Sequence, residues 1–492
     1  MVGSSRIFHL TRYLVASLAF LYFVIPYLRS HSSEYVRDHY ADLLRSFQDE
    51  KKLFVSDFLE NEVGGEMDGS ALAKLCASKT WIPPSQPVVV SCDPVPGGIG
   101  EVKNGQLNCI RFAIEIGAQL ILPRMHQRSP ADISNLQGGQ SHKGLSLDYM
   151  FSKPHLVASL QRHCPQLQVH DSLDALYDKP SLLKPLPVNV NQLTEDFATF
   201  DDTPTAIVQH PEELSARFTA FMDRELPIEK RYYPVRVHLA QTLFAWPTLN
   251  ETGAHFRADF GKLLRVRDDI RALAASALWN LAKTHAVKLL NPKAGTVVDG
   301  ASSDGGGGFT GIHLRTEQDT REGGWPPYKD QVPYHFNFFL HHMTPLPAGA
   351  PPRTVFLATG LTAKDDDVKN FRARAADFNA TVVVKRDLLD AAEISVLNGL
   401  TWDQRALLDY EILLRAGTML GIVESSFAWD VALRRGLAYG TGESEGFEAK
   451  PGGAAFQTGT YEKSELVMWK DRWSRLFGRS ERGVRMYYAM WP

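Results

Sequence analysis

The chain has 492 residues, with 53 Lys and Arg against 56 Asp and Glu, which gives a formal net charge of −3. Apolar residues make up 44% of the sequence and charged residues 22%, the composition of a globular protein. This composition excludes a disordered, collagen-like or multi-span membrane protein, and the length predicts two or three domains. The balanced charge, without a long basic run, indicates no nucleic-acid partner.

The N-terminus combines basic residues with an apolar run. Arg6 and Arg12 precede an uncharged stretch over 13–28. As a helix this stretch spans about 24 Å, which is short for a hydrocarbon core of about 30 Å but suits a thin early-secretory membrane. We therefore predict a cytoplasmic tail and signal-anchor over 1–30, in a single-pass type II protein of the Golgi or endoplasmic reticulum membrane. The alternative is a cleaved signal peptide that ends near Ser30 and Ser32.

The cysteines and two glycosylation triplets are relevant to whether the chain folds in the lumen of the secretory pathway. The cysteines are too few for a disulfide scaffold and include no Cys-x-x-Cys pair. They allow three complete pairings, among which the sequence does not choose. Triplets at 250–252 and 379–381 match N-glycosylation acceptors, which are compatible with a lumen and also arise by chance. The cysteines are Cys76, Cys92, Cys109 and Cys164.

A helical stem is predicted over 31–80, and a first α/β domain over 81–290. The apolar run 87–92 is typical of a buried strand. A glycine-rich turn, a helix over 103–118 and a strand at 120–122 follow it. This order makes a βαβ unit and implies a parallel sheet. Two helical runs, about 212–222 and 260–288, come later.

A second parallel sheet is predicted in a domain over 309–470. A flexible loop or linker over 291–308, with four successive glycines, precedes it. Strands are expected at 309–314, 354–358, 381–384 and 419–423, with helices at 364–378 and 402–415. A further helix begins at Phe427 and is expected to stop at Gly436. Residues 471–492 are expected to form a C-terminal tail.

The strongest local signal is Ser425-Ser426-Phe427, where a buried strand meets the start of a helix. Free backbone N–H groups and the helix dipole make that end an anion site, to which the hydroxyls add donors. Ligands of open α/β sheets collect at the carboxyl ends of strands, which is where this motif falls. The alternative is that one serine only caps the helix.

The second signal is His313-Leu314-Arg315, followed by Glu317 and Asp319. The strand ends at this motif, so Arg315 emerges at the same sheet edge as the serines. Its guanidinium fork matches two phosphate oxygens and keeps its charge, so that a diphosphate leaving group needs no metal there. The alternative is a surface ion pair between Arg315 and one of the two following acids.

The third signal is the turn Gly97-Gly98-Ile99-Gly100, because glycines let the backbone approach a ligand closely and permit positive φ. The turn lacks the third glycine and the closing acid of a dinucleotide fingerprint, which disfavours a nicotinamide enzyme. Three other patterns are interpreted as accidental or structural. They are the nucleophile-elbow letters at 442–446, the acidic run 365–367 and the histidine pair 341–342.

These segments, taken in order, resemble the motifs of the GDP-fucose protein O-fucosyltransferase family, especially its plant-like and fungal branch. The resemblance covers about residues 85–440 and includes 97–123, 148–151, 313–319, 355–360 and 408–435. It implies an α/β fold of the GT-B type, in which an acceptor-side and a GDP-sugar-binding Rossmann-like domain face a cleft. It also implies transfer of fucose from GDP-fucose to a hydroxyl acceptor, expected to be Ser or Thr of a protein, with inversion and without a metal or other cofactor.

The resemblance also implies roles for individual residues. Arg315 would grip the β-phosphate and stabilise its charge as the sugar leaves. Glu101 is the implied general base and Glu317 the second choice, although Gly100-Glu101 replaces the Asn-Gln that is common in the family. His313 and Asp409 would hold the nucleoside. The implied donor-binding residues are Gly97, Gly98, Ile99, His313, Arg315, Asp319, Asp409, Ser425, Ser426 and Phe427.

The expected partners are a GDP-sugar donor, a protein or glycan acceptor and a membrane. Two alternatives keep the same fold. One is a transferase that uses another sugar nucleotide. The other is a non-catalytic luminal protein that binds a nucleotide or a glycan.

Overall fold

The computed structural model describes residues 48–126, 144–194, 197–200, 203–246, 251–285, 287, 308–342, 352–439, 467–470, 473–478 and 490–492. The chain forms two compact units, Met1–Ser56 and Asp57–Pro492. In the first unit, residues 48–56 are helical. The predicted signal-anchor lies outside the described residues. Among the residues that are described, no helix is long and apolar enough to cross a membrane.

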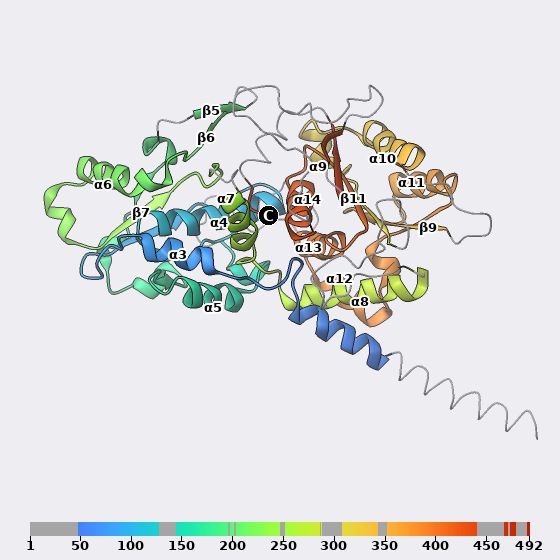
Figure 1. Cartoon of the computed structure of the whole chain (residues 1–492), viewed down its shortest axis with the longest axis horizontal. Helices are drawn as coiled ribbons and strands as arrows, with labels where there is room; N and C mark the ends of the chain where they lie inside the picture. The colour runs from blue at the N-terminus through green and yellow to red at the C-terminus, as the bar shows by residue number, and fades with distance from the viewer. Residues whose placement is uncertain are drawn as a thin grey trace, which may run out of the picture. The chain divides into compact units, whose positions relative to one another are not determined.

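The second unit contains, in its described part, two largely parallel sheets and a small antiparallel ribbon of β5 (Phe197–Phe200) and β6 (Thr203–Ala206) (Figure 1). The first sheet is five-stranded, in the order β3-β2-β1-β7-β4, and all its neighbours are parallel. We call this sheet and the helices that pack on it the first lobe. Its strands are β1 (Val88–Cys92), β2 (Gln119–Ile121), β3 (Val169–His170), β4 (Leu186–Val188) and β7 (Val235–Leu239).

Apolar residues and two disulfides hold the first lobe together. All five residues of β1 are buried, which explains the continuous apolar run in the sequence. One disulfide joins Cys92 in β1 to Cys109 in α4, and the other joins Cys76 in α3 to Cys164 at the end of α5. All four cysteines are therefore paired. The helices are α3 (Ser70–Ser78), α4 (Ile99–Glu115), α5 (Lys153–His163), α6 (Leu214–Glu225) and α7 (Glu251–Gly261).

The second sheet is six-stranded, in the order β10-β9-β8-β11-β13-β12, with only β12 antiparallel. The parallel strands, numbered along the chain from β8, have the order 3-2-1-4-5 of doubly wound sheets. Such a sheet changes its winding direction between strands 1 and 4, which here are β8 and β11. The strands are β8 (Thr310–His313), β9 (Arg353–Ala358), β10 (Ala380–Val383), β11 (Thr418–Ile422), β12 (Val467–Lys470) and β13 (Ser474–Phe477).

Helices cover the second sheet, and together they form the second lobe. An apolar core that includes Phe336 and Phe371 lies between the sheet and α10 and α11. α13 packs on β8 and β9, α14 packs on β11 and β13, and α8 packs on α13. The helices are α8 (Asp268–His285), α9 (Gln318–Glu322), α10 (Tyr328–His342), α11 (Asp366–Ala376), α12 (Ala391–Gly399), α13 (Trp402–Leu413) and α14 (Ser426–Tyr439).

Several helix boundaries differ from the sequence expectation. α4 begins at Ile99 rather than near Lys103, because Gly98 already has extended backbone at the N-cap. The predicted run 260–288 is broken where Val266 pairs with Phe151, which separates α7 from α8. α14 continues past Gly436 because one glycine within a helix is tolerated.

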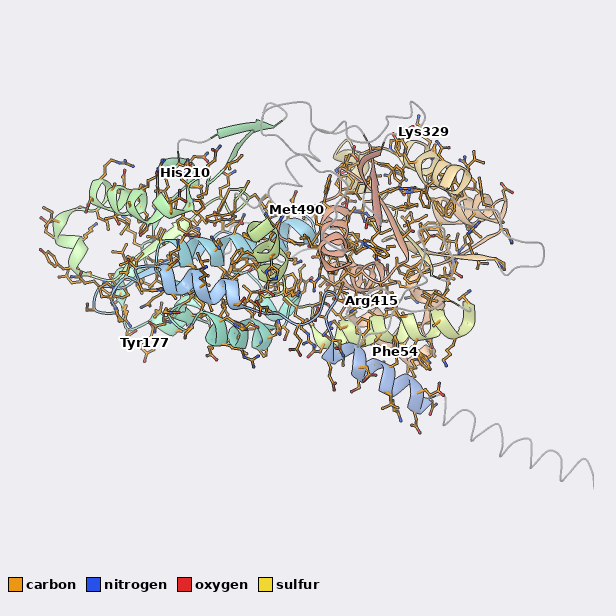
Figure 2. All side chains as sticks on the ribbon, in the orientation of Figure 1. Phe54, Tyr177, His210, Lys329, Arg415 and Met490 are labelled. Carbon is orange, nitrogen blue, oxygen red and sulfur yellow. A yellow bond between two sulfur atoms is a disulfide. The ribbon has the colours of Figure 1, made fainter. Side chains whose placement is uncertain are left out.

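Three segments pack in a different part of the molecule from the one that the predicted domain limits gave them. α8 falls within the predicted first domain, but it packs on α13 of the second lobe. α3 falls within the predicted stem, but it packs on α5 in the first lobe. Residues 471–492, expected to be a tail, include β13, and their last residues lie in the first lobe. Met490, labelled in Figure 2, is buried, and Arg257 donates to its carbonyl at 2.6 Å.

Candidate active site

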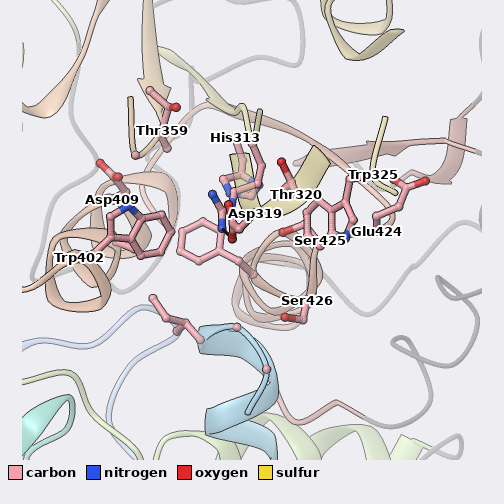
Figure 3. A pocket seen from close by; sticks show the side chains of 18 of the residues that line it. His313, Asp319, Thr320, Trp325, Thr359, Trp402, Asp409, Glu424, Ser425 and Ser426 are labelled. Atoms are coloured by element: carbon pink, nitrogen blue, oxygen red, sulfur yellow. Dashed lines mark hydrogen bonds and ion pairs between the residues drawn. The ribbon is translucent and has the colours of Figure 1, made fainter. Parts of the chain in front are cut away.

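A cavity of about 320 Å³ opens where the carboxyl ends of both sheets face each other. It is lined by the turn after β1, by the segments after β8, β9, β10 and β11, and by the first turns of α13. Figure 3 shows Trp402 and Asp409 on one side and Ser425, Trp325 and Glu424 on the other. The predicted site residues that line this cavity are Gly97, Gly98, Ile99, Glu101, His313, Arg315, Asp319, Asp409, Ser425, Ser426 and Phe427.

Arg315 follows β8 and is held by two carboxylates and one aromatic ring. Its Nη1 lies 2.6 Å from Glu317, and its Nη2 donates to Asp319. Its guanidinium carbon lies 4.7 Å from the centre of the Trp402 ring. The ion pair expected as the alternative interpretation is therefore present, but it is buried rather than on the surface, since Arg315 is only 8% exposed. Burial strengthens the ion pairs of Arg315 with the two carboxylates. Arg315 nevertheless lines the wall of the cavity.

Glu317 differs from the other predicted residues in that it does not line the cavity. Besides its ion pair with Arg315, it accepts a hydrogen bond of 2.7 Å from the backbone N–H of Gly360. A Cβ at position 360 would lie 2.5 Å from the Glu317 carboxylate and 2.8 Å from the Trp402 ring. Glu317 therefore orients Arg315, and both of its oxygens already have partners.

His313 is buried beside Arg315 and contacts Phe427, with 4.6 Å between the ring centroids and an angle of 30° between the ring planes. Burial lowers the pKa of His313 to about 3, and the charges of Arg315 and Lys385 act in the same direction. The imidazole is therefore neutral near pH 7. Its buried Nδ1 has no hydrogen-bond partner among the described residues. A neutral ring can donate or accept one hydrogen bond at this atom, according to its tautomer.

Asp409 and Lys385 form a second charged pair in the cavity wall. Lys385 Nζ donates to Asp409 Oδ2 and, at 2.7 Å, to the carbonyl of Thr359. Asp409 Oδ1 is buried and has no partner within the described part of the chain. Burial raises the pKa of Asp409 to about 6; Lys385 opposes this rise and Glu317 adds to it. The pair offers a ligand one buried acceptor atom.

Sequence reasoning missed Lys385 and Trp402. Lys385 comes two residues after the end of β10, just as Arg315 comes two residues after the end of β8, so a basic residue after a buried strand was a usable signal. Trp402 is the first residue of α13, after a Thr401 side chain that caps the helix. No linear pattern predicts that its ring covers Arg315, because the two residues are brought together only by the packing of α13 on β8.

Ser425 and Ser426 lie at the start of α14. Ser425 Oγ accepts from the backbone N–H of Ala428 at 3.2 Å, so the capping interpretation holds for this residue. Ser425 nonetheless lines the cavity. The first N–H groups of a helix have no intrahelical acceptors and carry partial positive charge. The end of this 14-residue helix therefore presents an anion site to the cavity.

The glycines of the first-lobe turn allow close approach, not unusual backbone angles. Gly97, Gly98 and Gly100 do not have positive φ, contrary to one reason given for them from the sequence. A Cβ on Gly100 would overlap the carbonyl of Ser426, whereas one on Gly98 would lie 3.2 Å from Ser426 Oγ. Gly100 thus lets α4 pack directly on α14.

Two further contacts fix this junction. A Cβ on Gly97 would overlap the Glu101 carboxylate, which therefore lies over the turn. Lys103 Nζ donates to Asp430 Oδ1 at 3.0 Å across the α4–α14 contact, and both side chains are buried. Burial lowers the pKa of Lys103 to about 8. Removing either member of such a buried pair is strongly destabilising, so the pair holds the two lobes in register.

The cavity lining carries both signs of charge, with Arg315, Lys385 and Arg405 beside Glu101, Asp319, Asp409 and Glu424, so an anion would be bound by local groups rather than by net charge. Arg315 and the end of α14 provide positive potential, and His313 and Asp409 provide polar atoms without partners in the described structure. Glu101 supplies a carboxylate on the opposite, first-lobe wall. Among the described residues, no group of three or more His, Cys, Asp or Glu side chains is placed to hold a metal ion.

Comparison with known proteins identifies the family of this chain. The sequence model of the GDP-fucose protein O-fucosyltransferases matches residues 88–438, which is more than half of the chain. The protein is thus a glycosyltransferase. It belongs to the GDP-fucose protein O-fucosyltransferase family, whose members use GDP-fucose as donor.

Solved structures provide a second comparison. A crystal structure of POFUT1 in complex with GDP is 13% identical, with a TM-score of 0.36 over 73% of this chain and 96% of that chain. A structure of the fucosyltransferase NodZ from Bradyrhizobium is 16% identical, with a TM-score of 0.34 over 72% and 92% of the two chains. No curated protein sequence matches this chain.

Proposed function

We propose that this protein transfers fucose from GDP-fucose to a hydroxyl group, with inversion at the anomeric carbon, without a metal, and on a GT-B arrangement of its two lobes. The expected acceptor is Ser or Thr of a protein. One observation carries the proposal. In a chain of this family, Arg315, the start of α14 and Glu101 in the first turn of α4 all line one cavity.

The second lobe would hold the donor. The diphosphate lies between Arg315 and the start of α14, with Ser425, Ser426 and Phe427 around it. To reach the guanidinium, phosphate oxygens replace one carboxylate that pairs with it in the free protein. Asp319 is the more easily replaced, because its side chain makes no second hydrogen bond within the described residues, whereas Glu317 also accepts from Gly360. As the C1–O bond breaks, Arg315 stabilises the charge that develops on the diphosphate.

The nucleoside would occupy the side of the cavity that contains Asp409 and His313. A guanine base presents N–H donors on one edge. Asp409 lines the cavity, and its buried Oδ1 atom is an acceptor without a partner in the described structure. His313 Nδ1 adds a neutral polar atom. Lys385 keeps the other oxygen of Asp409 occupied, which fixes the orientation of the carboxylate.

The first lobe would supply the base. In an inverting transfer the acceptor oxygen attacks C1 on the face opposite to the diphosphate. Glu101 lies on the wall opposite to Arg315 and takes the proton of the attacking hydroxyl, while GDP leaves with the bonding electrons. Glu317 is the second choice for this role, and its two existing partners make it the weaker candidate.

We also propose that the chain is a type II membrane protein of the Golgi or endoplasmic reticulum. The uncharged run 13–28 after Arg6 and Arg12 supports a signal-anchor. The two disulfides support a catalytic unit in an oxidising lumen, because disulfides are rare in reducing compartments.

The test is release of GDP from GDP-fucose by the purified full chain in a chelator-containing buffer, beside a panel of other sugar nucleotides. Arg315→Ala should lower turnover by about 100- to 1,000-fold, as expected when one donor to a developing oxyanion is lost. Arg315→Lys keeps the charge but not the fork and should recover little. Full turnover by Arg315→Ala would contradict the proposed role of Arg315 in stabilising the leaving diphosphate. GDP binding without turnover of any donor would favour a non-catalytic binding protein.

A further inference from the structure

The turn between α11 and β10 carries a triplet that the proposed reaction does not use. Asn379-Ala380-Thr381 has the Asn-x-Thr pattern of an N-glycosylation acceptor. The pattern alone is weak, because such triplets arise by chance. The structure adds the position, backbone conformation and contacts of both polar side chains.

Both side chains that a glycosylating enzyme must reach are exposed. Asn379 precedes β10, and Thr381 is the exposed residue of that strand, between buried neighbours. β10 is an edge strand of the second sheet, and no further strand in the described part of the chain pairs with its outer side. Within the described residues, neither side chain takes part in a hydrogen bond or ion pair, whereas backbone hydrogen bonds with Ala376 and Arg353 fix the position of Asn379.

The turn also explains why asparagine is structurally acceptable here. Asn379 has φ of 51°, and it is the one non-glycine residue with positive φ in the described part of the chain. Asn and Gly are the residues that most readily end a helix in this left-handed conformation. A purely structural explanation therefore accounts for Asn379, and an exposed threonine is also common in a β-strand, because its branched side chain favours that conformation. Variants at both positions are therefore needed to distinguish a structural role of the triplet from a role as a glycosylation acceptor.

The site lies away from the cavity. Asn379 comes before the amino end of β10, whereas Lys385 follows its carboxyl end and lines the cavity. Four strand residues separate these ends by about 13 Å. A glycan on Asn379 would leave the cavity open, so modification and catalysis are compatible.

We infer that Asn379 carries an N-linked glycan, added in the secretory pathway. The donor is an oligosaccharide on a lipid diphosphate. The Asn379 Nδ2 atom bonds to C1 of the oligosaccharide and loses one proton, and the C1–O bond breaks with release of the lipid diphosphate. Thr381 provides the hydroxyl that the acceptor pattern requires. The paired cysteines of the first lobe agree with folding in the same oxidising compartment.

The experiment is expression of the full chain in a eukaryotic secretory host, followed by mass spectrometry of the peptide that contains residue 379, before and after enzymatic deglycosylation. The wild type and Thr381→Ser should give a glycopeptide that deglycosylation converts to a peptide with Asp at 379. Asn379→Gly, which keeps the left-handed turn, and Thr381→Val, which keeps the β-branched shape, should lose the glycopeptide completely. Asn370→Gln, at an exposed asparagine of α11 outside any triplet, is the matched control.

An unmodified Asn379 in the wild-type peptide overturns the inference, whatever happens at the triplet at 250–252. Thermal unfolding of enzymatically deglycosylated samples should give Asn379→Gly and Thr381→Val the melting temperature of the wild type. Turnover of GDP-fucose should also be unchanged in these variants. Because the primary result is a peptide mass, its failure is distinguishable from a failure of the proposed transferase activity.

Discussion

The first lobe lines the cavity mainly with the backbone of one turn, whereas the second lobe lines it with charged and aromatic side chains from the ends of four strands and from α13. The difference follows from topology. In the second sheet β8 and β11 flank the point where the winding reverses, and Arg315 and Ser425 follow those two strands. The second lobe therefore brings a guanidinium and the start of a helix to this point of reversal, where we propose that the donor binds. In the first lobe, the glycine turn lets α4 pack closely on α14, and Glu101 places a carboxylate at the cavity.

The largest effect is expected from Glu101, the one charged residue that the described part of the first lobe contributes to the cavity lining. Glu101→Gln should lower kcat by about 100- to 10,000-fold, the range for loss of a positioned general base, and should leave GDP binding unchanged. Single-turnover kinetics and calorimetry measure the two quantities. Glu322→Gln, an exposed acid on α9 outside the cavity, is the control. Wild-type turnover in Glu101→Gln would assign the chemistry to the second lobe alone.

The next effect tests the close approach of the lobes. Gly100→Ala places a methyl group against the Ser426 carbonyl, so α4 and α14 must separate. A displacement of about 1 Å at a reacting centre lowers turnover by about 100-fold. Gly98→Ala meets only Ser426 Oγ, at 3.2 Å, and should be nearly silent. Equal kinetics for these two variants would show that the first lobe does not act through the shape of its turn.

A smaller effect should come from Asp409 in the second lobe. Asp409→Asn should weaken binding of GDP-fucose by about 10- to 100-fold, the range for a hydrogen bond to a charged group. Because the pKa of Asp409 is raised to about 6, the carboxylate is present above pH 6 and is lost below it. Wild-type affinity should fall as the pH drops from 7 to 5, and that of Asp409→Asn should stay flat.

Calorimetric titrations at these pH values check this dependence. GDP-fucose is the suitable ligand because its diphosphate, esterified at both ends, does not titrate in this range. His313 does not contribute, because its pKa of about 3 keeps it neutral throughout. A parallel decline in both proteins would exclude Asp409 as the titrating group.

The smallest effect is expected at the helix cap of the second lobe. Ser425→Ala removes the acceptor for the Ala428 N–H and should lower the free energy of unfolding by about 1 kcal/mol. Affinity for GDP should fall by less than about tenfold, because the N–H groups of α14 remain. Denaturant titration and calorimetry give both values, and Ser425→Thr should restore stability. A loss of binding as large as that of Asp409→Asn would give the hydroxyl itself a contact with the donor.

Local patterns predicted the strand ends that converge on the site. Buried parallel strands appear as short apolar runs, and whatever follows them gathers at one edge of the sheet, so Arg315 and Ser425 were expected to meet. The turn after β1 was found for the same reason. Its glycines were recognised from composition, although their physical role is contact between helices rather than special φ values.

What escaped prediction depends on contacts between distant segments. The pair of Lys385 and Asp409 joins the end of β10 to α13, and no periodicity marks it. The break between α7 and α8 is set by the bridge from Val266 to Phe151, in a stretch that otherwise has helical periodicity. The pairing of the four cysteines likewise required the fold.

The return of the final residues to the first lobe constrains how the chain can fold during synthesis. Trp491 donates to Asn104 and Asn108 of α4 and packs on Phe256 and Phe260 of α7. A ribosome delivers residue 491 only after the whole second lobe has been made, at about 5–20 residues per second. Until then Trp491 cannot cover Phe256 and Phe260 of α7. The nascent first lobe therefore exposes these aromatic side chains, which can bind chaperones or promote aggregation.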